Sequence, residues 1–204
     1  TPVVELDTDY DEDEKRFSIT ARQYCDATPG QSKKLPFHIP ISVGLIATDG
    51  TEVAAEVLEL TDTEQRFDFE NIAARPVVSA LRDFSAPIEL HANQSGADLA
   101  LLMRFDTDAF ARWEASQQLL LRSLHGLMET GSISDAASGL RYIFIELLDN
   151  GRADRSLVAQ LITLPDEPAV AVGLRDIDMG AIDKARRRLK QTLGTTLQQR
   201  FLDC

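Results

Sequence analysis

Histidine is the residue type best suited to hold a catalytic zinc ion, and the chain has three, His38, His91 and His125. Common zinc hydrolases carry the pattern HExxH, in which two histidines share one helix face and the glutamate acts as general base. The residues that follow the three histidines are Ile-Pro-Ile-Ser, Ala-Asn-Gln-Ser and Gly-Leu-Met-Glu, so none begins this pattern. The sequence therefore predicts no metal ligand and no catalytic residue among them.

Carboxylates gather at residues 7–14, in the run Asp-Thr-Asp-Tyr-Asp-Glu-Asp-Glu. Asp7, Asp9 and Asp11 have the spacing of the first, third and fifth ligands of a calcium-binding EF-hand loop. Such a loop needs glycine at its sixth position and glutamate at its twelfth, and the chain has Glu12 and Ser18 there. A solvent-exposed turn between two strands is the favoured interpretation, and a calcium loop is the less favoured one.

Nucleophilic and nucleotide-binding chemistry has no motif to support it. The chain contains no G-x-S-x-G elbow, no P-loop and no G-x-G-x-x-G turn. Cys25 has no histidine close to it in sequence, so we interpret it as an incidental thiol. The other cysteine is Cys204, and we expect both thiols to be reduced, as in a cytoplasmic protein.

A more concentrated set of chemical groups is Arg112-Trp113-Glu114, which contains the only tryptophan. Adjacent residues on a helix point about 100° apart, so these three cannot converge as a catalytic set. We predict a structural joint instead, with Asp106 as the N-cap of a helix and Phe105 and Phe110 as its hydrophobic staple. The predicted joint consists of Phe105, Asp106, Phe110, Arg112 and Trp113, with Trp113 as a core anchor.

The charge balance argues against nucleic acid as a partner. The chain has 33 acidic against 21 basic residues, a net charge of −12, and phosphate backbones repel such a surface. The basic run at residues 184–190, KARRRLK, is better explained as the polar side of a helix than as a nucleic-acid site. The most apolar segment, residues 140–148, is too short to cross a bilayer, which takes about 20 residues. We expect neither nucleic acid nor membrane as a partner.

Strand patterns dominate residues 1–95. Phe17, Ile19 and Ala21 alternate with polar residues, Asp49-Gly50 predicts a hairpin turn, and Pro40 predicts an edge position or a bulge. Seven short strands with frequent turn signals favour a β-sandwich of immunoglobulin-like architecture, without the Cys…Trp…Cys pattern of antibody domains. The predicted strands cover residues 3–6, 15–24, 37–50, 52–60, 64–71, 77–84 and 86–93.

A helical period follows, over residues 96–204. We predict a helix at 97–105, a second that ends near Gly131, a third from a Ser134 cap to Asn150-Gly151, and a fourth at 154–164. Such helices on short connections predict an all-α domain, the start of an α-solenoid or a small bundle. The last helix begins at the candidate cap Asp178 and is predicted to bury Ile182, Ala185, Leu189, Leu193 and Leu197. The expected domains are therefore 1–95 and 96–204.

Four segments resemble the bacterial aminopeptidase N group of the M1 family of zinc aminopeptidases. They occur in matching order, and the resemblance covers nearly the whole chain. In that family the matching region follows the catalytic domain and comprises a small β-sandwich and the first helices of the C-terminal helical domain. The segments are ATPGQSKKLPFHIPISVGL at 27–45, FSAPIEL at 84–90, DAFARWEASQQLL at 108–120 and DIDMGAIDKARRRLKQTL at 176–193.

The resemblance implies a parent enzyme that removes N-terminal residues from peptides. Its zinc is held by HExxH and a downstream glutamate, and a GAMEN motif binds the substrate amine. Neither motif occurs here, so no catalytic, cofactor-binding or metal-ligating residue is carried over, and we expect this chain to be inactive alone. The implied partners are the catalytic domain of the same polypeptide and the peptide substrates of the parent.

Two further expectations concern the extent of the chain and its role. It begins at Thr1 rather than methionine and ends at Cys204 without a helix stop signal, so we expect a piece of a longer protein. A tag-cleaved or processed protein is the alternative. For the role, the sandwich would be a rigid spacer that holds the helical domain over the catalytic domain, and the alternative is a stand-alone Ig-like module that binds a protein partner.

Overall fold

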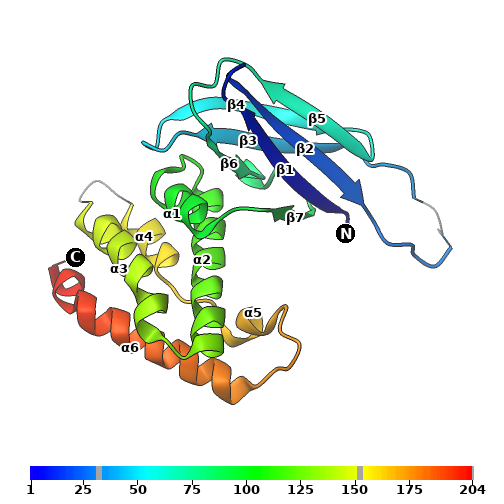
Figure 1. Cartoon of the computed structure of the whole chain (residues 1–204). Helices are drawn as coiled ribbons and strands as arrows, with labels where there is room; N and C mark the ends of the chain where they lie inside the picture. The colour runs from blue at the N-terminus through cyan, green and yellow to red at the C-terminus, as the bar shows by residue number, and fades with distance from the viewer. Residues whose placement is uncertain (31–33, 151–153, 204) are drawn as a thin grey trace. The chain divides into compact units, whose positions relative to one another are not determined.

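A computed structural model describes residues 1–30, 34–150 and 154–203 of the chain (Figure 1). These residues form two compact units, Thr1–Arg112 and Trp113–Cys204. The units divide inside helix α2 (Ala109–Thr130), so the first unit includes α1 (Gly96–Phe105) and the connection to α2, in which Asp106 and Asp108 accept bonds from Arg82 and from the Asp83 amide. The change from strands to helices, by contrast, lies at the Ser95 cap of α1, where the sequence places the domain boundary.

The first unit is built from two sheets. One sheet has the strand order β5-β2-β1-β7 and the other β4-β3-β6. All pairings are antiparallel except that of β1 with β7, which is parallel. The seven strands agree with the predicted sandwich and are β1 (Val3–Asp11), β2 (Arg16–Tyr24), β3 (Ile39–Ile46), β4 (Glu52–Leu60), β5 (Glu64–Phe69), β6 (Val77–Ala80) and β7 (Glu89–Ala92).

The period-two alternation of the sequence decides which side chains enter the core. Along β1, Val4 and Leu6 are buried while Glu5 and Asp7 are exposed, and Leu6 pairs in register with buried Ala21 of β2. Facing side chains come from β3 and β4 of the other sheet. The core residues with at most 1% of their surface exposed include Val4, Phe17, Ile19, Ile41, Val43, Leu45, Leu58 and Leu60.

Local turn signals were correct in most places. Gly50 has a φ of +88°, and its amide donates to the carbonyl of Ala47, as the Asp-Gly turn predicts. Pro40 pairs only with β4, because β6 reaches β3 only from Val43 to Ile46, so it occupies a locally open edge of the sheet. The acidic run is a hairpin as predicted, although Asp7 to Asp11 belong to β1 itself.

One predicted strand is wrong at its end. The strand at residues 77–84 stops at Ala80, and Arg82–Phe84 form a short 3-10 helix, η1. Leu81, Asp83 and Phe84 have positive φ values of 58°, 54° and 51°, which extended strand backbone does not allow. The chain therefore turns sharply between β6 and β7.

A buried glutamine fastens the end of β2 to two other segments. Gln23 is 4% exposed, and its amide nitrogen donates to the carbonyls of Phe37 (2.8 Å) and Asp62 (3.0 Å). Its amide oxygen accepts the N–H of Phe37 at 2.8 Å. The side chain thus satisfies three backbone groups, of which those of Phe37 precede β3 and that of Asp62 lies in the β4–β5 turn.

The second unit is all-α. Helix α6 packs along α3 and contacts α5, and its predicted apolar face is confirmed, because all five predicted residues are at most 5% exposed. Asp178 caps α6 by accepting the N–H groups of Gly180 and Ala181. None of the described helices combines the length and apolar character that crossing a bilayer requires. Besides α2, the helices are α3 (Ile133–Asp149), α4 (Arg155–Leu161), α5 (Glu167–Ala171) and α6 (Met179–Asp203).

Three helix boundaries differ from the sequence prediction. The cap of α3 is Ser132, which accepts the N–H of Asp135, and not Ser134. Helix α4 ends at Leu161, and α5 is an additional helix whose cap, Asp166, accepts the N–H of Ala169. Gly151, the predicted stop of α3, lies outside the described residues. These shifts arise because several Ser and Asp residues nearby have equivalent capping chemistry.

We expect Gln23→Leu to lower the free energy of unfolding of the first unit by about 3 kcal/mol, because buried backbone groups lose their partner. Urea unfolding would measure the loss. The control is Gln65→Leu, which removes only solvent-accessible bonds from the amide and the hydroxyl of Thr61 and should change stability by less than about 1 kcal/mol. Equal effects of the two substitutions would contradict the assigned role of Gln23.

Candidate functional site

The three histidines lie in separate environments. His38 contacts the carboxylate of Glu59, and His91 lies 3.0 Å from that of Glu89. His125, on α2, lies 2.8 Å from the carbonyl of Val170. Within residues 1–30, 34–150 and 154–203, no group of three or more His, Cys, Asp or Glu side chains is arranged to hold a metal ion.

The contacts of Cys25 and of the basic run at residues 184–190 are with neighbouring parts of the chain. Cys25 is a free, half-buried thiol, 3.3 Å from the amine of Lys34, and Cys204 lies outside the described residues. In the run at 184–190, Arg186 donates to the carbonyl of Pro165 and Arg187 pairs with Asp183 one turn away. These contacts fit the interpretation of the run as the polar side of a helix.

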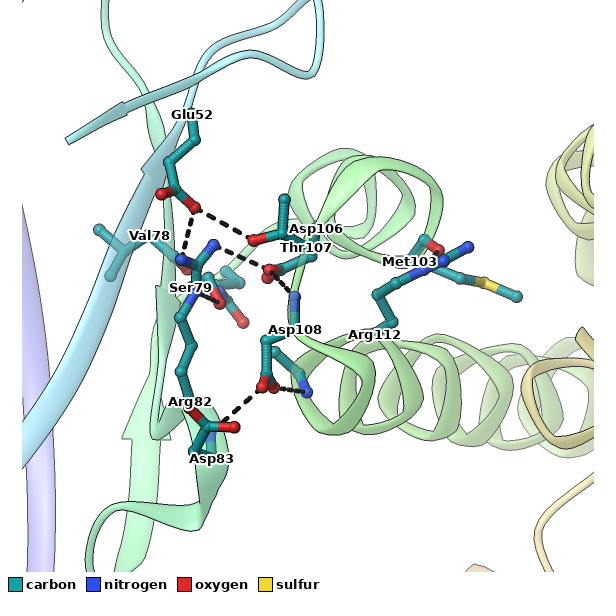
Figure 2. A network of polar contacts seen from close by, with 12 residues as sticks. Glu52, Val78, Ser79, Arg82, Asp83, Met103, Asp106, Thr107, Asp108 and Arg112 are labelled. Atoms are coloured by element: carbon teal, nitrogen blue, oxygen red, sulfur yellow. Dashed lines mark hydrogen bonds and ion pairs between the residues drawn. The ribbon is translucent and has the colours of Figure 1, made fainter. Parts of the chain in front are cut away.

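The densest polar network of the first unit centres on Arg82 (Figure 2). Its Nε donates to Ser79 Oγ at 3.0 Å, Nη1 lies 2.5 Å from Glu52 Oε2, and Nη2 lies 2.8 Å from Asp106 Oδ1. The Arg82 side chain is 8% exposed and that of Asp106 is 0% exposed. One guanidinium therefore joins β4, β6 and the connection between α1 and α2.

Two glycines make room for this network. A Cβ atom at Gly44 would lie 2.1 Å from Cζ of Arg82, so only glycine lets the guanidinium lie across the middle of β3. At Gly50 a Cβ would lie 2.6 Å from Cγ of Phe105, the last residue of α1. The first approach places the Arg82 guanidinium on the sheet, and the second places the end of α1 against the turn between β3 and β4.

The segment that carries Arg82 has a strained backbone that its contacts hold in place. The N–H of Asp83 donates to Asp108 Oδ2 at 3.2 Å, and that of Phe84 donates to the carbonyl of Leu81 at 3.0 Å. The ring of Phe84 meets that of Phe110 edge-on, with centroids 5.5 Å apart. Left-handed backbone at non-glycine residues persists only where such surroundings determine it.

The predicted N-cap of α2 is wrong. Helix α2 begins at Ala109, and Asp108 is its cap, since its Oδ1 accepts the N–H of Ala111 at 2.6 Å. Asp106 instead ends α1 and accepts N–H groups from Arg82 and Asp108. The staple assignment fails with the cap, because Phe105 packs against Gly50 and Phe110 against Phe84.

The two remaining joint residues differ from each other. Arg112 donates from Nε to the carbonyl of Met103 at 3.0 Å, and burial lowers the pKa of its guanidinium, opposed by the nearby charge of Asp106. Trp113 is not the predicted core anchor, because 37% of its surface is exposed. The buried residues of α2 are Ala111, Ala115, Ser116, Leu120, Leu124 and Leu127.

The sequence pattern placed Asp106 and Phe110 in the predicted joint, close to the network, but it did not identify the residue at the centre of the network. It singled out neither Arg82 nor its partners Glu52 and Ser79. A glycine inside a strand often marks a place where another group approaches the backbone closely. Gly44 is such a glycine, and it is the feature of the sequence that could have indicated the network. Which side chain approaches could not be read from spacing, because Arg82 follows Gly44 by more than thirty residues.

We expect Arg82→Met to destabilise the first unit by about 3–5 kcal/mol, because it leaves Asp106 buried without its cation. Arg66→Met is the matched control. Arg66 is 48% exposed, pairs with Asp68 and donates to Ser18 Oγ, whose own bond to Asp68 remains, so its loss should change stability by at most about 1 kcal/mol. Thermal unfolding of both variants would measure the two losses of stability. An Arg82→Met protein as stable as the control would refute the central role of the pair of Arg82 and Asp106.

Comparisons with known proteins match the whole chain. A family model described as a domain of unknown function with an Ig-like fold, DUF3458, matches residues 1–93. A second, DUF3458_C, described as ARM repeats, matches residues 96–204. The predicted sandwich followed by a helical domain is thereby confirmed.

The similar proteins and the similar solved structure are aminopeptidases. Aminopeptidase N of Escherichia coli is 32% identical over 99% of this chain, and that of Haemophilus influenzae is 29% identical over 99%. A crystal structure of Legionella pneumophila aminopeptidase A with aspartic acid matches 99% of the chain with a TM-score of 0.83 and 27% identity.

The chain spans only 24% of the length of each of these two aminopeptidase N relatives and 23% of the Legionella chain. The match nevertheless extends through both the strand-rich and the helical parts. The chain therefore belongs to the family in which the Ig-like DUF3458 domain precedes the ARM repeats of DUF3458_C, and it corresponds to that segment of aminopeptidase N.

Proposed function

We propose that this chain is a non-catalytic supporting segment of an M1 zinc aminopeptidase that releases N-terminal residues from peptides. The observation that carries the proposal is the coverage: 99% of this chain aligns with aminopeptidase N, yet only 24% of that relative is matched. HExxH and GAMEN are absent from this sequence, so the peptide-cleaving groups belong to another part of the longer protein.

In this proposal zinc is a cofactor of the longer protein and not of this segment. Zinc is held by three or four side chains at about 2.0–2.3 Å, and the described residues offer no such set. The partner of the segment is the catalytic domain of the same polypeptide, and neither nucleic acid nor membrane takes part. We infer a cytoplasmic setting, in keeping with the free thiol of Cys25.

The role of the segment is mechanical. Its sandwich has a close-packed core, and Arg82, Asp106 and Asp108 bond the end of α1 and the first turn of α2 to the strands. Within the first unit, the buried pair of Arg82 and Asp106 therefore holds the connection between α1 and α2 in place. A rigid spacer of this kind holds the helical domain over the active site, so that a closed chamber admits peptides and excludes folded proteins.

We expect the purified chain, with one equivalent of zinc, to leave an aminoacyl-p-nitroanilide unhydrolysed above the buffer rate, because it lacks the groups that activate water. Release of p-nitroaniline would be followed by absorbance, with E. coli aminopeptidase N as the positive control. Turnover that scales with the concentration of this chain and with bound zinc would overturn the non-catalytic assignment.

The reading frame that encodes the chain tests the second half of the proposal. HExxH and GAMEN encoded in frame before Thr1 would support it, and the full-length product should then hydrolyse the same substrate. An initiator methionine directly before Thr1 would favour a stand-alone Ig-like interaction module instead.

A further inference from the structure

An open groove of about 440 Å³ lies on the face of the β4-β3-β6 sheet that carries Arg82. Its floor is formed by Ser42 of β3 and by Ala55 and Val57 of β4. Its wall consists of Asp83 from η1 and of Thr107 and Asp108 from the α1–α2 connection, which Figure 2 shows beside the Arg82 network. All of these residues belong to the first unit.

Apolar surface is exposed in and beside this groove. Val57 is 49% exposed, and Val53, four residues earlier on β4, is 46% exposed. Phe84 directly follows Asp83 and is 58% exposed, although its ring edge contacts Phe110. Large apolar side chains grouped on one face, beside a groove with a polar rim, are typical of protein interaction sites.

The backbone that presents Phe84 is strained. Leu81, Asp83 and Phe84 all have left-handed φ values, which are unfavourable for residues other than glycine. The contacts of Arg82 and Asp108 hold this conformation, yet the aromatic ring that it presents remains mostly in solvent. A rigid, pre-positioned aromatic side chain loses little entropy when a partner covers it.

The groove also has an unbalanced charge. Arg82 is neutralised by Glu52 and Asp106, whereas no basic side chain within the described part of the chain forms an ion pair with Glu56, Asp83 or Asp108. The wider unit has the same sign, since residues 1–112 contain 21 acidic and 10 basic side chains, and residues 113–204 contain 12 and 11. The complementary partner surface therefore carries an arginine or lysine between apolar side chains.

We propose that this groove is the surface on which the catalytic domain of the longer protein docks, through a basic side chain flanked by apolar ones. The inference rests on the proposed function, which supplies the partner. The relatives match 99% of this chain, and about three quarters of their own length lies outside the match, which gives the partner its source. Domains of one chain bury interfaces of about 600–1,500 Å², enough to cover the groove and Phe84 together.

The test compares backbone hydrogen exchange in the 204-residue chain and in the full-length protein encoded by the same reading frame. We expect the amides of residues 55–57 and 81–85 to exchange at least about tenfold more slowly in the full-length protein, because docking covers them. Equal exchange in the two proteins would overturn the proposal.

The substitution Val57→Asp gives a second test of docking, which is independent of hydrogen exchange. Val57→Asp adds a negative charge to the exposed, acidic groove, so it should lower the Tm of the full-length protein while leaving that of the 204-residue chain within about 2 °C. Leu35→Asp, at a 78% exposed position outside the groove, is the matched control and should affect neither protein. An unchanged Tm of the full-length protein would contradict docking here.

The remaining outcomes separate this inference from the proposed function. A full-length protein that hydrolyses aminoacyl-anilides but shows no protection at the groove leaves the proposed function intact and refutes the docking surface. A reading frame without catalytic motifs refutes both. If the full-length protein sediments as a dimer that Val57→Asp dissociates, the occupant is a second copy, and the catalytic domain is excluded.

Discussion

The buried ion pair between Arg82 and Asp106 is the constraint on which one whole corner of the first unit depends. A guanidinium with 8% of its side chain exposed has to satisfy both its charge and its donors inside the protein, and it does so through Glu52, Ser79 and Asp106. Because these partners come from β4, β6 and the α1–α2 connection, one side chain relates segments that are far apart in sequence. The absence of a Cβ at Gly44 is the steric condition for this arrangement.

The same contacts that join these segments also hold a strained stretch of backbone. The charges that fasten α1 and the first turn of α2 to the strands also hold the left-handed backbone of Leu81, Asp83 and Phe84. The strain is thus stored by contacts within the first unit, and it keeps an aromatic ring at the surface.

The sequence predicted the elements well and their junctions poorly. Strand and helix periods are local properties, so the alternation of β1 and β2 and the buried face of α6 could be read directly. Asp106 and Asp108 have the same capping chemistry, and only the position of Arg82 decides that Asp106 becomes an ion-pair partner while Asp108 caps α2. Trp113 lies on the apolar face of the helical pattern, yet burial depends on what packs against that face, which the pattern does not contain.

The sequence by itself therefore determined the architecture, the absence of HExxH and GAMEN, and the family, because these depend on residue order and spacing. Only the tertiary structure decided where the charges of the joint go, that Phe84 stands exposed beside an acidic groove, and that Gly44 is a steric requirement. The physical reason is the distance along the sequence over which each kind of interaction acts. Periodicity and capping act over a few residues, whereas a buried charge selects its partners by distance in space, from positions that no local pattern relates.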